Sequence, residues 1–217
     1  MTSESSSSRS YYSQLLLYLQ QEGKQKFGPQ FYFRKTDIPL ILQLMYYFLN
    51  DEEKAKQHKI DLTKGIMLSG PIGCGKTTLL RLMKLIAVEE KKFFFFTCRE
   101  ISFEFIKEGY DVIHRYSKGV PGKHTQKHIG FDDLGTEKNL KYFGNEANVM
   151  AEIILTRYDM YHDNKFLTHI TTNLSATELE DYYGNRVRSR LRNMCNLIFF
   201  DKEAVDKRWK SENINQC

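Results

Sequence analysis

The 217-residue sequence lacks the features that mark several large classes of protein. Its four cysteines form no C-x-x-C pair; they are Cys74, Cys98, Cys195 and Cys217. A disulfide framework and a zinc site are therefore not expected, and a reducing cytoplasm is the expected compartment. No apolar run approaches the length of a membrane-spanning helix, so no contact with a membrane is expected either.

The N-terminus also lacks the apolar stretch of a signal peptide. Residues 1–10 are polar and rich in Ser, and we expect them to form a disordered tail. With 41% hydrophobic and 27% charged residues, the composition is ordinary for a globular protein that has one sizeable core. The net charge of +5 is mildly basic, which permits a nucleic-acid partner but does not establish one.

The strongest pattern that is present fits G-x-x-x-x-G-K-[ST], the phosphate-binding P-loop. Glycines at its tight points let successive backbone N–H groups wrap around phosphates. Lys76 would reach the β- and γ-phosphates, and the hydroxyl of Thr77 would ligate Mg²⁺. The residues expected to bind ATP are Gly70, Pro71, Ile72, Gly73, Cys74, Gly75, Lys76, Thr77 and Thr78.

The alternative for this pattern is a glycine-rich turn that matches by chance. The flanking sequence argues against it, because residues 65–69 are an apolar run and residues 77–88 have helical periodicity. Strand, loop and helix are the context that phosphate binding requires.

Two later segments add polar groups at strand ends. Asp132 and Asp133 end an apolar run, and we expect Asp132 to hold Mg²⁺ and Asp133 to polarise the attacking water. An acidic turn is the alternative. Further on, residues 171–173, Thr-Thr-Asn, offer polar groups where a γ-phosphate would lie. Taken locally, a turn Asn followed by a helix cap explains them better, and only the order of P-loop, acidic strand and Asn-ended strand favours the functional interpretation.

Five apolar runs alternate with helical patterns, which predicts an α/β fold with a parallel five-stranded sheet covered on both faces. The expected strands are residues 65–69, 93–98, 127–133, 168–172 and 197–200. Helices are expected at residues 11–21, 99–118 and 145–161, among others. Residues 11–64 would form a helical segment packed on the core at residues 65–200, and residues 201–217 a short charged tail.

Residues 65–200 resemble the AAA+ ATPases of the DnaC helicase-loader and IstB transposition-helper type. The resemblance rests on the P-loop, residues 129–135, residues 171–174 and the Arg-rich residues 183–191. It implies a three-layer P-loop NTPase core in which Asn173 is sensor 1. It also implies that Arg186 and Arg190 face the ATP of a neighbouring subunit, Arg190 being the arginine finger.

This sequence departs from that family in two ways. Asp133 replaces the usual Glu, which implies slow hydrolysis, and the C-terminal helical lid with its sensor 2 arginine is expected to be absent. Arg186 and Arg190 share one helix face, whereas Arg188 pairs with Arg192 on another. The alternative for this segment is a basic surface helix that balances the acidic residues just before it.

The expected function is therefore an AAA+ ATPase that forms a homo-oligomer and loads or remodels a helicase or a transposase-like protein. Non-specific contact with single-stranded DNA is expected from Lys107, Arg115, Lys118, Lys123 and Lys127, interleaved with Tyr110 and Tyr116. A solvated helix face with core aromatics is the alternative there. A nucleotide-gated interaction module with little hydrolysis and, less favoured, a P-loop kinase remain the competing functions.

Overall fold

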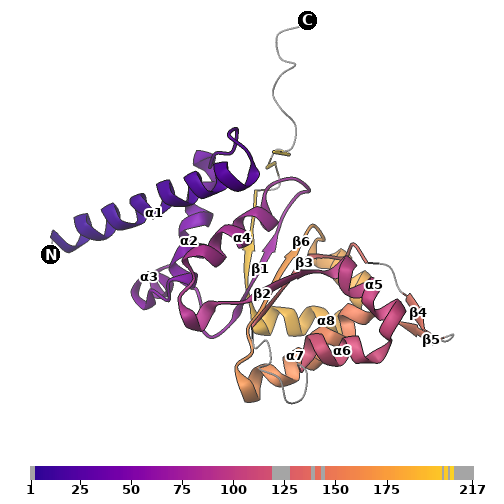
Figure 1. Cartoon of the computed structure of the whole chain (residues 1–217). Coiled ribbons are helices and arrows are strands. Elements are labelled where there is room, and N and C mark those ends of the chain that lie inside the picture. The colour runs from indigo at the N-terminus through magenta and orange to yellow at the C-terminus, as the bar shows by residue number, and fades with distance from the viewer. Residues whose placement is uncertain are drawn as a thin grey trace, which may run out of the picture.

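The computed structural model describes residues 3–118, 128–137, 140–142, 145–201, 203–204 and 206–207. Its centre is a parallel five-stranded sheet in the order β2-β3-β6-β1-β7 (Figure 1). The strands are β1 Gly65–Ser69, β2 Phe94–Thr97, β3 Ile129–Leu134, β6 Thr168–Thr172 and β7 Cys195–Phe199. The predicted α/β fold class and the five predicted strands are confirmed.

The central strand β1 shows why the sheet needs cover on both faces. All of its residues are buried, and it pairs with β6 on one side and β7 on the other. Ile66 and Leu68 pack into one hydrophobic core, whereas Met67 packs into the other. Successive side chains of a strand point to opposite faces, so an uninterrupted apolar run is what a doubly covered strand requires.

Two helical layers supply the cover (Figure 1). One core joins the sheet to the N-terminal helices and to α4; these helices are α1 Ser3–Phe27, α2 Ile38–Phe48, α3 Glu52–Gln57 and α4 Lys76–Ile86. The other core lies under α5 Cys98–Glu108, α6 Tyr110–Ser117, α7 Val149–Asn164 and α8 Ala176–Met194. Short 3-10 turns occur at η1 Lys35–Asp37 and η2 Glu89–Lys91.

The N-terminal segment is more helical than expected. Helix α1 extends beyond residues 11–21 at both ends and includes residues 3–10, where the composition suggested a disordered tail. The same segment contains a short helix, α3, whose first turn is capped by Asp51: its side chain accepts a hydrogen bond from Lys54 N at 2.9 Å. The division of the chain into segments stays a prediction.

Two further elements differ from the sequence expectations. The single helix expected at residues 99–118 is divided at Gly109, whose φ of 67° separates α5 from α6. A hairpin of β4 Leu140–Tyr142 and β5 Asn145–Ala147 precedes α7, where we expected the helix to begin at residue 145. Among the described residues, no helix is long and apolar enough to cross a membrane.

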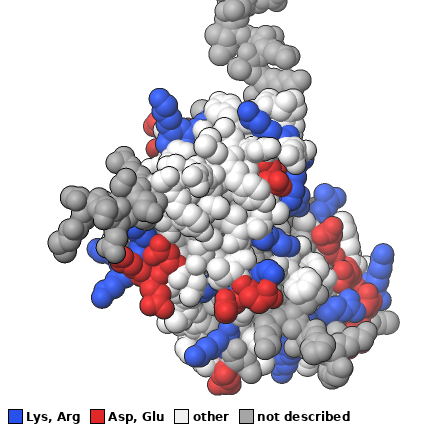
Figure 2. All heavy atoms as spheres, turned by 60° about the vertical axis from the view of Figure 1, so that its left-hand side comes forward, with Lys and Arg blue, Asp and Glu red and all other residues white. Residues whose placement is uncertain are grey.

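Figure 2 turns the N-terminal helical layer forward. Basic and acidic side chains are interspersed on this face, and a broad area between them carries neither. This face therefore presents no large field of a single sign.

Candidate functional site

The P-loop lies between the end of β1 and the start of α4. Gly73 and Gly75 have φ values of 79° and 104°, in the left-handed region that favours glycine. Gly75 is the residue directly before α4, so the loop leads into the N-terminus of that helix. Helix N-termini present unpaired N–H groups and positive potential to an anion. The geometry that a phosphate cradle needs is thus present at the predicted residues.

The side chain of Lys76 folds against the backbone of this loop. Its Nζ donates hydrogen bonds to the carbonyl oxygens of Gly70 at 2.8 Å and Pro71 at 2.9 Å. Only 5% of the residue is exposed, which is unusual for a lysine. A phosphate seated in the loop would offer the ammonium group a charged acceptor in place of two neutral ones.

The hydroxyl of Thr77 and the carboxylate of Asp132 meet beside the loop. Thr77 Oγ1 donates to Asp132 Oδ1 at 2.8 Å, across 55 positions of sequence. Thr171 Oγ1 donates to the same oxygen at 2.6 Å. Burial raises the pKa of the Asp132 carboxyl above its usual range, and the hydrogen bonds from Thr171 and Thr77 oppose that rise.

Asp133 has an unusual backbone. Its φ of 56° lies in the left-handed region, and the register between β3 and β6 shifts between Phe131 and Leu134. Asp tolerates this conformation better than most residues. A bulge at a strand end re-aims the side chain that follows, and such distortions concentrate at functional sites. The Asp133 N–H donates to Thr171 Oγ1 at 2.8 Å, so Thr171 holds both aspartates.

Of residues 171–173, only part joins the hydrogen bonds around Asp132 and Asp133. Asn173 lies just beyond β6 and its side chain is exposed. Thr171 and Thr172 are fully buried, and Thr172 Oγ1 donates to the Leu134 carbonyl oxygen at 2.7 Å. The sequence placed residues 171–173 near a γ-phosphate and gave the specific role to Asn173, but it did not predict that Thr171 holds both aspartates. The signal was available, because a polar side chain within a buried strand needs a hydrogen-bond partner.

The residues present fit a magnesium ion. Across the described part of the chain, no group of three or more His, Cys, Asp or Glu residues could hold a metal by itself. Mg²⁺ is commonly bound by one or two protein oxygens and completes its shell with phosphates and water. Thr77 and Asp132 supply such oxygens directly beside the P-loop.

The C-terminal segment also reaches the P-loop, which the sequence did not suggest. Lys207 N donates to the Gly73 carbonyl oxygen at 3.1 Å, and Lys207 Nζ pairs with Asp37 at 2.6 Å. Asp206 lies so close that a Cβ placed on Gly73 would be 1.9 Å from its Oδ1. A side chain at Gly73 would therefore have to displace the Asp206 carboxylate, in addition to adopting an unfavourable φ.

The Arg-rich segment lies in the α7–α8 layer, on the other face of the sheet from α4. Helix α8 is kinked at Gly184, with φ 81°. Arg186 is exposed, and the Arg190 guanidinium lies 4.9 Å from the centroid of the Tyr158 ring. Arg188 pairs with Glu180 at 2.7 Å instead of pointing only to solvent.

The segment expected to contact DNA is largely engaged within the fold. Arg115 pairs with Glu104 at 3.0 Å and also with Glu108. Tyr116 is buried and donates to Glu104 at 3.0 Å, so the core alternative is the better description of this ring. Lys107, Lys118 and Tyr110 are exposed. Lys123 and Lys127 lie outside the described residues.

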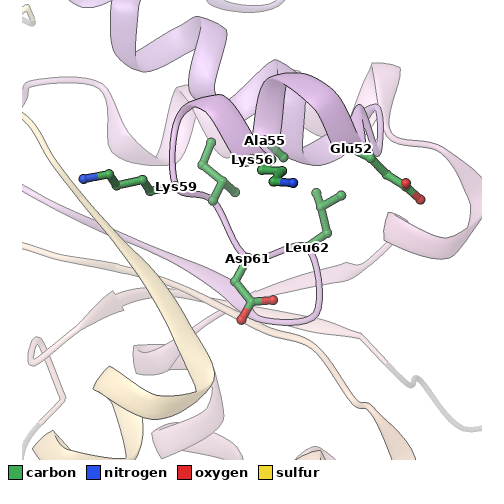
Figure 3. A pocket seen from close by; sticks show the side chains of 7 residues that line it. Glu52, Ala55, Lys56, Lys59, Asp61 and Leu62 are labelled. Atoms are coloured by element: carbon green, nitrogen blue, oxygen red, sulfur yellow. The ribbon is translucent and has the colours of Figure 1, made fainter.

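A hollow with a volume of about 380 Å³ lies beside α3, away from the P-loop (Figure 3). Lys59 and Glu52 extend to opposite sides of it, and Ala55 and Leu62 lie between them. Its lining mixes both signs of charge and includes none of the predicted site residues.

Comparison with known proteins supports the fold. No family model matches the sequence, and no curated protein sequence matches it significantly. The DnaC helicase loader structure has a TM-score of 0.54 and 22% identity, covering 79% of this chain and 94% of that one. The DnaI structure has a TM-score of 0.52 and 16% identity, and the match covers 80% of this chain and 89% of the DnaI chain. AMPPCP-bound DnaA from Aquifex aeolicus has a TM-score of 0.50 and 14% identity, and the match covers 80% of this chain and 48% of the DnaA chain. The chain therefore shares the fold of the DnaC and DnaI structures, with its parallel five-stranded sheet, as the sequence resemblance predicted.

Proposed function

We propose that this chain is a Mg²⁺-dependent AAA+ ATPase that assembles through its nucleotide sites and loads or remodels a partner protein. The observation that carries the proposal is the hydrogen-bonded set of Thr77, Asp132 and Thr171 beside the P-loop. A chance glycine-rich turn would not bring a P-loop hydroxyl and a buried carboxylate from another strand to within 2.8 Å.

Each residue then has a role in binding or turnover. Backbone N–H groups of the loop surround the phosphates, and Lys76 exchanges its bonds to Gly70 and Pro71 for bonds to the β- and γ-phosphates. Thr77 and Asp132 hold Mg²⁺, which supplies charge neutralisation when it is bound. Asp133 orients the attacking water, and Asn173 contacts the γ-phosphate.

The arginines act between subunits in this proposal. Arg186 and Arg190 are separated from the P-loop of their own chain by the sheet, because α4 covers one face and α8 the other. They would therefore serve the ATP of a neighbouring copy. The contact between Arg190 and Tyr158 holds the guanidinium in place, and an arginine finger contributes up to ~10³–10⁵ in rate.

The partner in this proposal is a replicative helicase or a transposase-like protein, with non-specific contact to DNA. The support is the fold shared with DnaC and DnaI, the first of which is a helicase loader. Slow turnover is expected, because Asp133 has a shorter side chain than the Glu usual at this position in the family.

The test is an ATPase assay with and without single-stranded DNA, combined with a mass measurement with and without ATP. Stimulated turnover together with ATP-dependent assembly supports the proposal. Binding without turnover would favour a nucleotide-gated interaction module, and transfer of phosphate to an acceptor would favour a kinase.

A further inference from the structure

The second half of α8 carries a polar stripe that the ATP site does not use. The stripe has the spacing i, i+3, i+4, i+7 and i+8, which places its members on one face of a helix. They line a hollow with a volume of about 370 Å³. The members are Asn185, Arg188, Ser189, Arg192 and Asn193.

Lys64 and Tyr158 complete the wall of this hollow. Every side chain that lines it can donate a hydrogen bond, and none is a carboxylate. The hollow beside α3 differs, because its lining carries both acidic and basic side chains (Figure 3), and the face in Figure 2 also mixes the two signs of charge. A wall of donors is suited to an anion with several acceptor oxygens.

The charges of the hollow are only partly neutralised. Glu180 accepts a hydrogen bond from Arg188 Nη1 at 2.7 Å, but Arg188 Nε is buried without a hydrogen-bond partner. Among the described residues, neither Lys64 nor Arg192 belongs to an ion pair. Lys64 and Arg192 therefore have no described carboxylate within ion-pair distance, although Asp61 interacts electrostatically with Lys64.

The hollow lies at the end of the sheet opposite the P-loop. Lys64 immediately precedes β1, and Asn193 lies two positions before β7 begins at Cys195, whereas the P-loop follows the end of β1. Binding here would therefore leave the nucleotide site of the same chain accessible.

We infer that this hollow binds the phosphate backbone of a nucleic-acid strand without reading its bases. Arg188 and Arg192 are one helical turn apart, about 6 Å along the axis, which suits two phosphates of one strand better than a single ion. Lys64 lines the same hollow, and Asn and Ser donate to phosphate and sugar oxygens. The inference rests on the proposed DNA contact and assigns it to α8 instead of α5 and α6.

The test compares Lys64→Gln/Arg192→Gln with wild type in binding a fluorescent 20-mer of dT, followed by anisotropy. Neither residue is in an ion pair, so the fold should be retained. We expect the affinity to fall tenfold or more, and the slope of log K against log salt to fall by about 1.4, at ~0.7 for each contact with a single strand. The matched control, Lys24→Gln/Lys26→Gln on α1, removes the same charge and should bind as wild type does.

A duplex of the same length distinguishes double-stranded from single-stranded DNA as the source of the phosphates. With the duplex, the slope of log K against log salt should fall by about 1.8 in Lys64→Gln/Arg192→Gln, at ~0.9 for each contact. The inference would be overturned by equal losses in both double variants or by loss only in Lys107→Gln/Lys118→Gln. Displacement of the strand by inorganic triphosphate at equal charge concentration would overturn it as well. Normal DNA binding combined with failed ATP-dependent assembly would assign the hollow to a subunit interface, and would also overturn it. ATP binding and assembly, measured in parallel, test the proposed function separately.

Discussion

Replacing Thr171 with valine removes one hydroxyl and leaves the shape of the side chain nearly unchanged. That hydroxyl donates to Asp132 Oδ1 at 2.6 Å and accepts from Asp133 N–H at 2.8 Å, and the residue is fully buried. A hydrogen bond to a charged group is worth roughly 1.5–3 kcal/mol, and a partly buried N–H left without a partner costs about 1 kcal/mol more. We expect the free energy of unfolding at neutral pH to fall by roughly 2–4 kcal/mol, measured by urea denaturation.

The pH dependence of this loss tests the reasoning more sharply. Thr171 stabilises the charged form of Asp132, so its removal should raise the pKa of that carboxyl further above its usual range. The folded chain with a raised carboxyl pKa loses stability as pH rises through that pKa, and the variant should lose more than wild type does. The difference between the two proteins should therefore shrink in acid, below the pKa of Asp132 in the unfolded chain.

Binding of ATP with Mg²⁺ should follow the same shift. A protonated carboxyl is a poor magnesium ligand, so Thr171→Val should lose Mg²⁺-dependent binding at a higher pH than wild type as the pH falls. Thr172→Val is the matched control, because Thr172 is equally buried and donates to the Leu134 carbonyl oxygen instead of to a carboxylate. If Mg²⁺-dependent ATP binding has the same pH dependence in both variants, Thr171 does not act on the Asp132 carboxyl as described.

Two other predictions separate the remaining roles. Asp132→Asn should weaken Mg²⁺-dependent ATP binding, whereas Asp133→Asn should keep binding and lose turnover; normal hydrolysis by Asp133→Asn would mean that the base lies elsewhere. Arg190→Ala should bind ATP normally, lose turnover and assemble poorly. Mixing it with Lys76→Ala should restore part of the activity in a coupled ATPase assay, and no recovery between folded, associating mutants would argue against an arginine acting between subunits.

The sheet could be predicted from the sequence because parallel strands covered on both faces are unbroken apolar runs. The expected bounds of β1 and β6 match the structure, and the P-loop motif determines its own position between β1 and α4. The position of Asp132 beside the P-loop could be predicted for the same reason, since a carboxylate at the end of a buried strand lies at the edge of the sheet where the P-loop begins.

The rest depends on contacts that local patterns do not encode. The break at Gly109 needs a positive φ that a glycine permits but does not require. The ion pair of Lys207 with Asp37 joins residues 170 positions apart, and it depends on the final packing beside the loop. The role of Thr171 in holding both aspartates was not predicted, because β-branched residues are common in strands and its hydroxyl was not distinguished from ordinary strand propensity.

We expect Lys76 and its loop to bind the phosphates of ATP. Isothermal titration of Mg²⁺–ATP into wild type, Lys76→Ala and Lys84→Ala tests it most directly, because Lys84 is an exposed cation on the same helix. We expect wild type and Lys84→Ala to bind Mg²⁺–ATP with the same affinity, and Lys76→Ala to give no binding heat. A cooperative urea transition like that of wild type is the control that Lys76→Ala is folded. Unchanged ATP affinity in a folded Lys76→Ala would contradict the assignment of this loop as the nucleotide site.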